Sequence, residues 1–239
     1  MSGHSHFKSI KHAKGITDAK KGKVFSKISR LISIAAKEGG GNPETNAKLR
    51  LAIEQARAVN MPKDNVQKAI DRGSGKVAGE KLEQFVFEAY GPGKIAIIIE
   101  GITDNKNRAL GEIKQILNQN NGKLAGEGSV KWMFERKGAV IASSEEFKKE
   151  DLELAAIEAG AEDIYWRDDL LDVYTKPEEL EKVKKTLEEK GVKVESSSLD
   201  WIAKEMVGIA EKEKESCQKL FEALDENEAV QDIYSNLKI

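Results

Sequence analysis

Residues 84–102 read QFVFEAYGPGKIAIIIEGI, and this stretch decides the fold class. Its two halves, 84–89 and 95–102, are rich in Val, Ile and Phe, the residue types that β-strands favour. Gly91-Pro92-Gly93 between them is typical of a turn. The stretch therefore predicts a β-hairpin, and the uninterrupted apolar run at 95–99 predicts a buried strand.

The residues before this hairpin repeat with the period of amphipathic helices. The expected helices cover residues 18–37, 47–59 and 62–73. The glycine run 39–41 is suited to ending the first helix, Thr45 or Asn46 to capping the second, and Pro62 to opening the third. Three short amphipathic helices bury their apolar faces against one another, so residues 1–78 are predicted to form a three-helix domain.

Helices and strands are mixed after the hairpin. A helix is expected over residues 105–119 and a strand over 129–134. The next six elements are expected at 139–142, 149–159, 163–166, 171–175, 177–190 and 192–196, in the order strand, helix, strand, strand, helix, strand. This βαββαβ order is that of the ferredoxin-like unit. A helix at 211–224 and a closing strand at 232–237 are expected to complete the chain.

The predicted fold class is α+β, with several domains. The junction at 201–209 is apolar and is expected to return the chain to the domain of the hairpin. The predicted division is an N-terminal three-helix domain at 1–78, an α/β middle domain at 79–137 plus 201–239, and an inserted ferredoxin-like βαββαβ domain at 138–200.

Composition limits where the protein works. The 239 residues are 39% hydrophobic and 33% charged, as in globular proteins with a well-solvated surface. The longest apolar run, 95–99, is far shorter than the roughly 18 residues that cross a bilayer. Residues 1–14 lack the apolar stretch of a secretory signal, and Cys217 is a single cysteine without a disulfide partner. We therefore expect a cytoplasmic protein with no membrane partner.

The charges are separated along the chain although they nearly cancel overall. Residues 1–76 contain sixteen Lys and Arg and six Asp and Glu, a balance of +10, whereas the remainder contains 23 and 35, a balance of −12. Such asymmetry is typical of a basic domain for an anionic partner on an acidic body. A solvated surface whose charges happen to cluster is the alternative interpretation.

The basic residues are densest between Lys8 and Arg30. Cations on a helix and its lead-in bind phosphates, because each neutralised phosphate releases condensed counterions. The expected nucleic-acid contacts are Lys8, Lys11, His12, Lys14, Lys20, Lys21, Lys23, Lys27 and Arg30. Four of them, Lys20, Lys23, Lys27 and Arg30, fall away from the apolar stripe of the first helix, so alanine there is expected to change stability by only about 0.5 kcal/mol per site.

Other residue groups are better explained without chemistry. The glycine stretches 39–41 and 122–129 match neither the P-loop nor the dinucleotide fingerprint. The acidic pair Asp168-Asp169 lacks a supporting base or ligand pattern, and Cys217 has no nearby histidine. His4 gains metal ligands only if Met1 is removed, and no second ligand set supports it. We predict no catalytic site, metal, cofactor or small-molecule substrate.

Several motifs resemble the YebC/PmpR family, and they occur in the family's order. They are Gly3-His4-Ser5, Ile10-Lys11-His12, residues 18–27, 36–43 and 60–64, Tyr90-Gly91-Pro92-Gly93, residues 103–108, Gly128-Ser129-Val130 and residues 134–138. One departure is Ser5-His6-Phe7-Lys8, where the family more often has a Ser-Lys-Trp type of sequence. The resemblance covers most of the first 138 residues and implies three domains, with the third inserted in the second.

The resemblance also implies a regulator of gene expression. Members are generally described as DNA-binding transcriptional regulators, and mitochondrial relatives as translational activators associated with the ribosome. A DNA-binding transcriptional regulator is therefore the first expectation, and a translation activator that binds ribosomal RNA through the basic domain is the alternative. An adaptor whose basic face meets an acidic protein is a third class. Since one fold hosts different mechanisms, fold alone does not choose among them.

Overall fold

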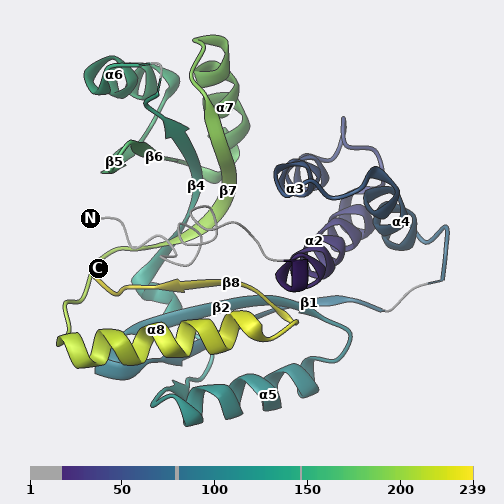
Figure 1. The fold of residues 1–239 in the computed structure, drawn as a ribbon, viewed down its shortest axis with the longest axis vertical. Coiled ribbons are helices and arrows are strands. Elements are labelled where there is room, and N and C mark those ends of the chain that lie inside the picture. Colours follow the sequence, from purple (N-terminus) through teal and green to yellow (C-terminus); the bar gives the residue numbers. More distant parts are fainter. Residues whose placement is uncertain (1–17, 79–80, 146, 239) are drawn as a thin grey trace.

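A computed structural model describes residues 18–78, 81–145 and 147–238, with the backbone alone for residues 18–20 (Figure 1). These residues form seven α-helices and two four-stranded antiparallel sheets, so the predicted α+β class is confirmed. None of the described helices is long and apolar enough to cross a membrane.

The first three helices pack into a small bundle. They are α2 (Asp18–Gly39), α3 (Ala47–Ala58) and α4 (Lys63–Gly73). Asn46 caps α3, because its Oδ1 accepts a hydrogen bond from the Leu49 amide at 3.0 Å while its Nδ2 donates to the Ala35 carbonyl at 2.8 Å. Pro62 lies at the cap position, one residue before α4, where we had expected it inside the helix. Ile32 and Leu49 are fully buried between the helices.

The expected hairpin forms the centre of the first sheet. Its strands β1 (Glu83–Tyr90) and β2 (Ala96–Thr103) pair antiparallel, with Tyr90 opposite Ala96. The short strand β3 (Lys123–Leu124), which the sequence did not predict, extends the sheet beyond β1, and β8 (Val230–Ser235) pairs with β2 on the other side. The strand order is therefore β3-β1-β2-β8.

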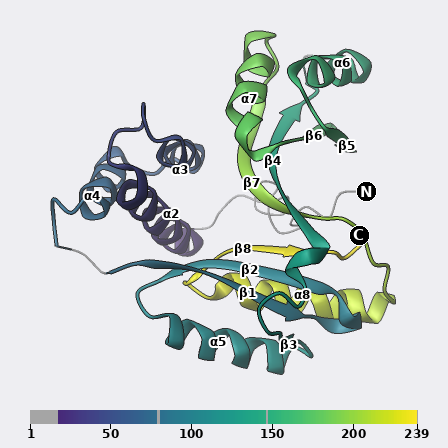
Figure 2. The ribbon, with the colours of Figure 1, turned by 180° about the vertical axis from the view of Figure 1, so that it is seen from behind.

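Both faces of β2 are covered, which explains why its sequence is apolar without alternation. Helices α5 (Lys106–Gln119) and α8 (Glu211–Glu226) cover one face, where Ile97 and Ile99 pack (Figure 2). Ala96 and Ile98 face the other way and pack with Phe134 and Tyr234. The C-terminal helix and strand thus pack with the hairpin.

The second sheet has the order β5-β6-β4-β7. Its elements follow the expected βαββαβ sequence, with one helix after each of β4 and β6. They are β4 (Phe134–Ser143), α6 (Lys149–Ala159), β5 (Asp163–Arg167), β6 (Leu170–Thr175), α7 (Leu180–Glu189) and β7 (Val194–Ala203). The two helices contribute Leu152 and Val183 to a core against β4 and β6.

Two long strands differ from the expectation. The predicted strand at 129–134 is wrong: Lys131–Met133 forms a 3-10 turn, and β4 runs without a break from Phe134 to Ser143. Strand β7 continues to Ala203, where it pairs with Phe134, although a strand was expected only over 192–196. The predicted domain limits at 137 and 200 therefore lie inside paired strands.

Glu100 links the two sheets where β4 and β7 lie against β2. It lies on β2 and accepts hydrogen bonds from the Trp201 indole at 2.8 Å and the Arg136 guanidinium at 3.0 Å. Arg136 and Lys131 both lie over the Trp201 ring, each 5.1 Å from its centroid. Charged and aromatic groups thus hold the long strands β4 and β7 on the first sheet.

Candidate nucleic-acid interface

The structure describes only part of the expected nucleic-acid site. Lys8, Lys11, His12 and Lys14 lie outside the described residues, as does the side chain of Lys20. The remaining four, Lys21, Lys23, Lys27 and Arg30, lie on α2. Lys21 and Lys23 are exposed, Arg30 is half-buried and Lys27 is buried.

Three cations of α2 bind carboxylates that follow one another along the chain. Lys23 pairs with Glu226, and Lys27 Nζ lies 2.9 Å from Oδ1 of Asp225. Arg30 donates from Nη1 to the Glu228 carbonyl at 2.6 Å and from Nη2 to Oε2 of Glu228 at 3.3 Å. The hydrogen bond that Lys23 donates to Glu226 raises the pKa of Lys23 above its ordinary value.

We call the segment 225–228 the acidic turn. Its carboxylates stand where the sequence alone predicted phosphates, because it joins the end of α8 to β8 directly beside α2. Lys27 is only 7% exposed at this contact. Lys20, Lys23, Lys27 and Arg30, which we call the α2 ridge, were expected to bind nucleic acid. In this structure Lys23, Lys27 and Arg30 instead bind the acidic turn.

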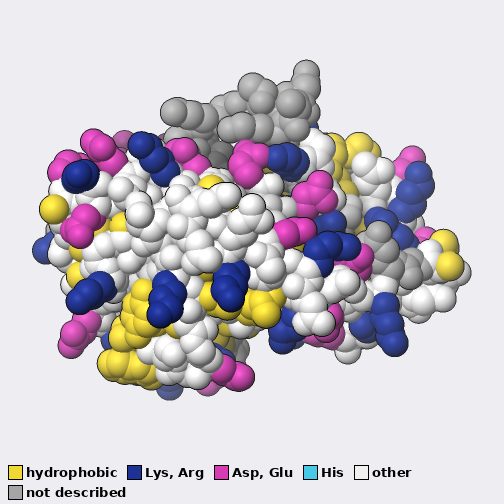
Figure 3. Space-filling model, turned by 90° about the horizontal axis from the view of Figure 1, so that it is seen from below, with side chains coloured by type: hydrophobic (Ala, Val, Ile, Leu, Met, Phe, Trp, Pro, Cys, Tyr) yellow, Lys and Arg dark blue, Asp and Glu magenta, His cyan; other side chains and the backbone are white. Residues whose placement is uncertain are grey.

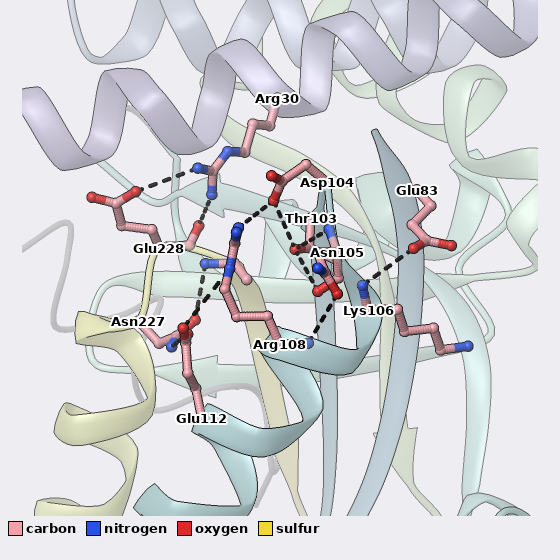
Figure 4. Close-up of polar contacts among 11 residues, drawn as sticks. Arg30, Glu83, Thr103, Asp104, Asn105, Lys106, Arg108, Glu112, Asn227 and Glu228 are labelled. Atoms are coloured by element: carbon pink, nitrogen blue, oxygen red, sulfur yellow. Dashed lines mark hydrogen bonds and ion pairs between the residues drawn. The ribbon is translucent and has the colours of Figure 1, made fainter. Parts of the chain in front are cut away.

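A polar pocket lies next to the acidic turn (Figure 4). Its volume is about 430 Å³, and Arg30, Arg108 and Glu112 line it together with the acidic turn. Arg108 pairs with Asp104 at the start of α5, and Nδ2 of Asn227 donates to Oε2 of Glu112 at 2.8 Å. Because each arginine already faces a carboxylate, the pocket is close to neutral.

The family-like motif 103–108 has a structural role at this pocket. Oδ1 of Asn105 accepts a hydrogen bond from the Arg108 amide at 3.0 Å and caps α5. Oε1 of Glu83 accepts from the Lys106 amide at 3.2 Å, so a second amide of the first turn is also occupied. Asn105 of the motif and Glu83 of β1 therefore occupy two of the free amides at the start of α5.

Backbone amides at the end of the glycine-rich stretch 122–129 also bind a carboxylate of the chain itself. Glu88, which is 4% exposed on β1, accepts hydrogen bonds from the amides of Gly128 and Val130, both at 2.6 Å, and of Lys131 at 2.9 Å. Burial acts to raise the pKa of Glu88, but these three amides outweigh it and hold the pKa below its ordinary value. Amides that a bound phosphate would need are thus occupied by Glu88.

A second set of cations was missed by the sequence reasoning. Lys37, Arg72 and Lys81 line a groove of about 990 Å³ between α2, the end of α4 and the segment that follows it. In Figure 3, Lys and Arg side chains are spread over the whole face, including the end where Figure 1 places the first three helices. The sequence held a weak signal, since Arg72 and Lys76 flank Gly73-Ser74-Gly75.

The described residues contain no cluster of three or more His, Cys, Asp or Glu side chains that could hold a metal ion. Cys217 is fully buried in the core of the first sheet, where its Sγ lies 3.6 Å from the Pro92 carbonyl oxygen. Burial raises the pKa of this thiol to about 11, so the reactive thiolate is scarce at neutral pH.

The fold and its basic first domain are those of a known group of proteins. A model of the TACO1/YebC protein N-terminal domain matches residues 5–76, and a model of the TACO1/YebC second and third domain matches residues 82–237. The chain therefore belongs to the TACO1/YebC family.

Full-length relatives agree with this assignment. A protein of Halothermothrix orenii named "Probable transcriptional regulatory protein" is 46% identical over 242 residues, which cover 100% of this chain and 96% of that one. A Thermotoga maritima protein of the same name is 45% identical, with 100% and 94% covered. The crystal structure of a conserved hypothetical protein from Aquifex aeolicus, 40% identical, superposes with a TM-score of 0.87 over 93% of this chain and 92% of that one.

Proposed function

We propose that this protein is a nucleic-acid-binding regulator of gene expression, and specifically a transcriptional regulator that binds DNA through its first domain. The observation that carries the proposal is the charge separation: residues 1–76 have a balance of +10 and the rest of the chain −12. The names of the relatives support regulation of transcription. We retain the division into domains at 1–78, 79–137 plus 201–239, and 138–200 as part of this proposal.

The proposal gives the chain no catalytic step. Binding to phosphates requires positive side chains near the surface, and the first domain has them on more than one face. The residues proposed for contact remain Lys8, Lys11, His12, Lys14, Lys20, Lys21, Lys23, Lys27 and Arg30. Of these, Lys23, Lys27 and Arg30 reach a nucleic acid only by leaving the acidic turn.

Ribosomal RNA is the second candidate partner, and the acidic body favours it. A net charge of −12 on residues 77–239 repels a long duplex unless the first domain alone approaches it. A protein bound in a pocket of the ribosome meets RNA locally and with less of its acidic surface.

Crosslinking in living cells separates the two candidates. The intact protein would be crosslinked by ultraviolet light, purified under denaturing conditions, and the attached nucleic acid sequenced. Enrichment of promoter DNA supports the transcriptional proposal, and enrichment of ribosomal RNA assigns the translational alternative. Recovery of neither above the level of an uncrosslinked sample contradicts nucleic-acid binding in the cell.

A further inference from the structure

The groove of the first domain differs from the α2 ridge in having cations that face no carboxylate. Three positive side chains, Lys37, Arg72 and Lys81, line it and are exposed. Among the residues described, none of the three forms an ion pair, and no Asp or Glu lines the groove. Lys37 donates one hydrogen bond, to the Leu82 carbonyl at 2.9 Å, which leaves two of its three N–H groups for a ligand.

The floor of the groove is formed by short serine side chains of α2. Ser26, Ser29 and Ser33 are spaced along one face of α2. Apart from Arg30 and Lys37, they are the described residues of α2 that line the groove. Ser33 donates to the Ala69 carbonyl at 2.9 Å, so it also joins α2 to α4. Short side chains let an extended ligand approach the helix, and the hydroxyls of Ser26 and Ser29 are suited to donate to phosphate oxygens.

Glycine keeps the two helices close enough to form this floor. A Cβ at Gly73 would lie 2.1 Å from the Ser33 carbonyl oxygen, so only glycine permits the approach of α4 to α2. Gly75, with φ of +76°, then turns the chain, and Val77 and Ala78 line the far wall. The side chain of Val77 is 56% exposed on this wall and offers an apolar contact.

We propose that this groove binds the phosphodiester backbone of a nucleic-acid strand, with Lys37, Arg72 and Lys81 neutralising successive phosphates. The inference rests on the proposed function and adds the place of contact. An acidic protein segment is the competing ligand, but such partners are anchored by apolar side chains in pockets, and Val77 projects outward on the wall of an open groove.

Arg30 connects this groove to the second domain. It lines both the groove and the pocket beside the acidic turn, while its guanidinium is bound to Glu228. A phosphate at this end of the groove therefore meets a cation that is already shared with a carboxylate. Lys37, Arg72 and Lys81 therefore supply most of the binding in this proposal, and the test replaces these three residues.

The test uses the full chain and two fluorescein-labelled probes, a 20-nucleotide single-stranded RNA and a 20-base-pair DNA duplex. The variant Lys37→Ala/Arg72→Ala/Lys81→Ala is compared with Arg57→Ala/Lys63→Ala/Lys68→Ala, which removes the same charge from exposed sites of α3 and α4 outside the groove. Anisotropy is measured from 50 to 300 mM salt, and far-UV circular dichroism confirms that both variants are folded.

We expect the groove variant to bind about 10 to 100 times more weakly at 0.1 M salt. Its slope of log affinity against log salt should fall by about 2 with RNA and about 3 with DNA, since each lost phosphate contact contributes about 0.7 or 0.9. The control should change affinity by less than about threefold. The probe with the larger loss identifies the kind of strand that the groove holds.

Other results overturn the inference in distinguishable ways. Equal losses in both triple variants mean that only net charge matters, while an unchanged groove variant places the nucleic acid elsewhere; the proposed function survives either result. No binding by the unaltered chain contradicts the proposed function as well. If binding of a labelled 20-residue polyglutamate depends on the three cations, and binding of neither nucleic acid does, the groove holds an acidic protein.

A single substitution in the floor provides an independent check. Ser29 is half-buried and lines the groove next to Arg30, so Ser29→Glu places a carboxylate inside the proposed phosphate path, and Ser29→Gln is the neutral control of the same size. We expect the Glu variant to bind at least about five times more weakly than the Gln variant. Equal binding by the two variants contradicts the groove as the site.

Discussion

The Nζ atom of Lys27 lies 2.9 Å from Oδ1 of Asp225 and 2.7 Å from the Asp225 carbonyl oxygen. One ammonium group thus holds α2 against the end of α8, 198 residues away in the sequence. Its side chain is 9% exposed and that of Asp225 is 22% exposed, so water replaces few of these contacts. A residue of the expected phosphate-binding ridge is therefore also part of the interface between two domains.

This contact corrects the stability expected for the ridge. Lys27→Ala removes two hydrogen bonds to Asp225 at a nearly buried contact, and we expect the free energy of unfolding to fall by about 1–3 kcal/mol rather than about 0.5. Urea unfolding followed by circular dichroism measures this. Lys63→Ala, at an exposed site of α4, is the control and should stay within about 0.5 kcal/mol. Indistinguishable midpoints for the two variants would show that the Lys27 contact does not persist in solution.

The acidic turn is expected to compete with nucleic acid for the same cations. Asp225→Asn/Glu226→Gln/Glu228→Gln leaves Lys23, Lys27 and Arg30 without these carboxylates, so affinity for a DNA duplex should rise about 3- to 30-fold at 0.1 M salt and the salt slope should steepen by about 1–3. Fluorescence anisotropy across a salt series measures both quantities.

A matched control separates competition from the general loss of negative charge. Glu205→Gln/Glu211→Gln/Glu215→Gln removes the same charge from exposed positions that are several helical turns from the acidic turn along α8 or precede that helix. If this control raises affinity as much as the change in the acidic turn, long-range repulsion and not competition explains the effect.

Glu88 should make the stability of the protein depend on acid pH. Its pKa is held below the ordinary value of 4.5, so its carboxylate stabilises the fold above about pH 4.5, and this contribution is lost as pH falls through the folded-state pKa. Glu88→Gln should therefore lower the free energy of unfolding by about 1–3 kcal/mol at pH 7 and by much less at pH 3. Urea titrations of both proteins at the two pH values measure the difference, and a gap that is as wide at pH 3 as at pH 7 argues against an ionised Glu88.

Gly73 should tolerate no side chain. Gly73→Ala places a Cβ 2.1 Å from the Ser33 carbonyl oxygen, and this clash is relieved only if α2 and α4 move apart. We therefore expect the free energy of unfolding to fall by at least about 2 kcal/mol. In Gly22→Ala the new Cβ has no neighbour within 4 Å, and the helical site should gain about 0.5–1 kcal/mol. Thermal unfolding compares the two, and a Gly73 variant as stable as the Gly22 variant would show that the helices move apart at little cost.

Much of the secondary structure follows from local patterns. The hairpin of β1 and β2 was predicted because Gly91-Pro92-Gly93 interrupts two strand-like runs, and α6 was predicted with its bounds at Lys149 and Ala159. These elements depend on interactions between residues a few positions apart, so the local sequence is enough to predict them. The βαββαβ order was predictable for the same reason.

The long strands were less predictable because their ends depend on partners. The segment 134–138 reads as charged and turn-like, yet it continues β4 because it pairs with residues 199–203 of β7 and rests on Glu100. Pairing over some sixty positions leaves no periodic mark in either segment. The short strand β3 exists for a similar reason, since Ala89 and Tyr90 supply its partner groups.

The sequence by itself determined the α+β class, the family and the charge separation between a basic start and an acidic body. Only the tertiary structure decided what the cations of α2 face. A helical period tells which side chains avoid the apolar stripe, but it does not tell whether water, a phosphate or a distant carboxylate meets them. Folding brings residues 225–228 to Lys23, Lys27 and Arg30, and it leaves Lys37, Arg72 and Lys81 facing an open groove, because that choice depends on how whole domains pack.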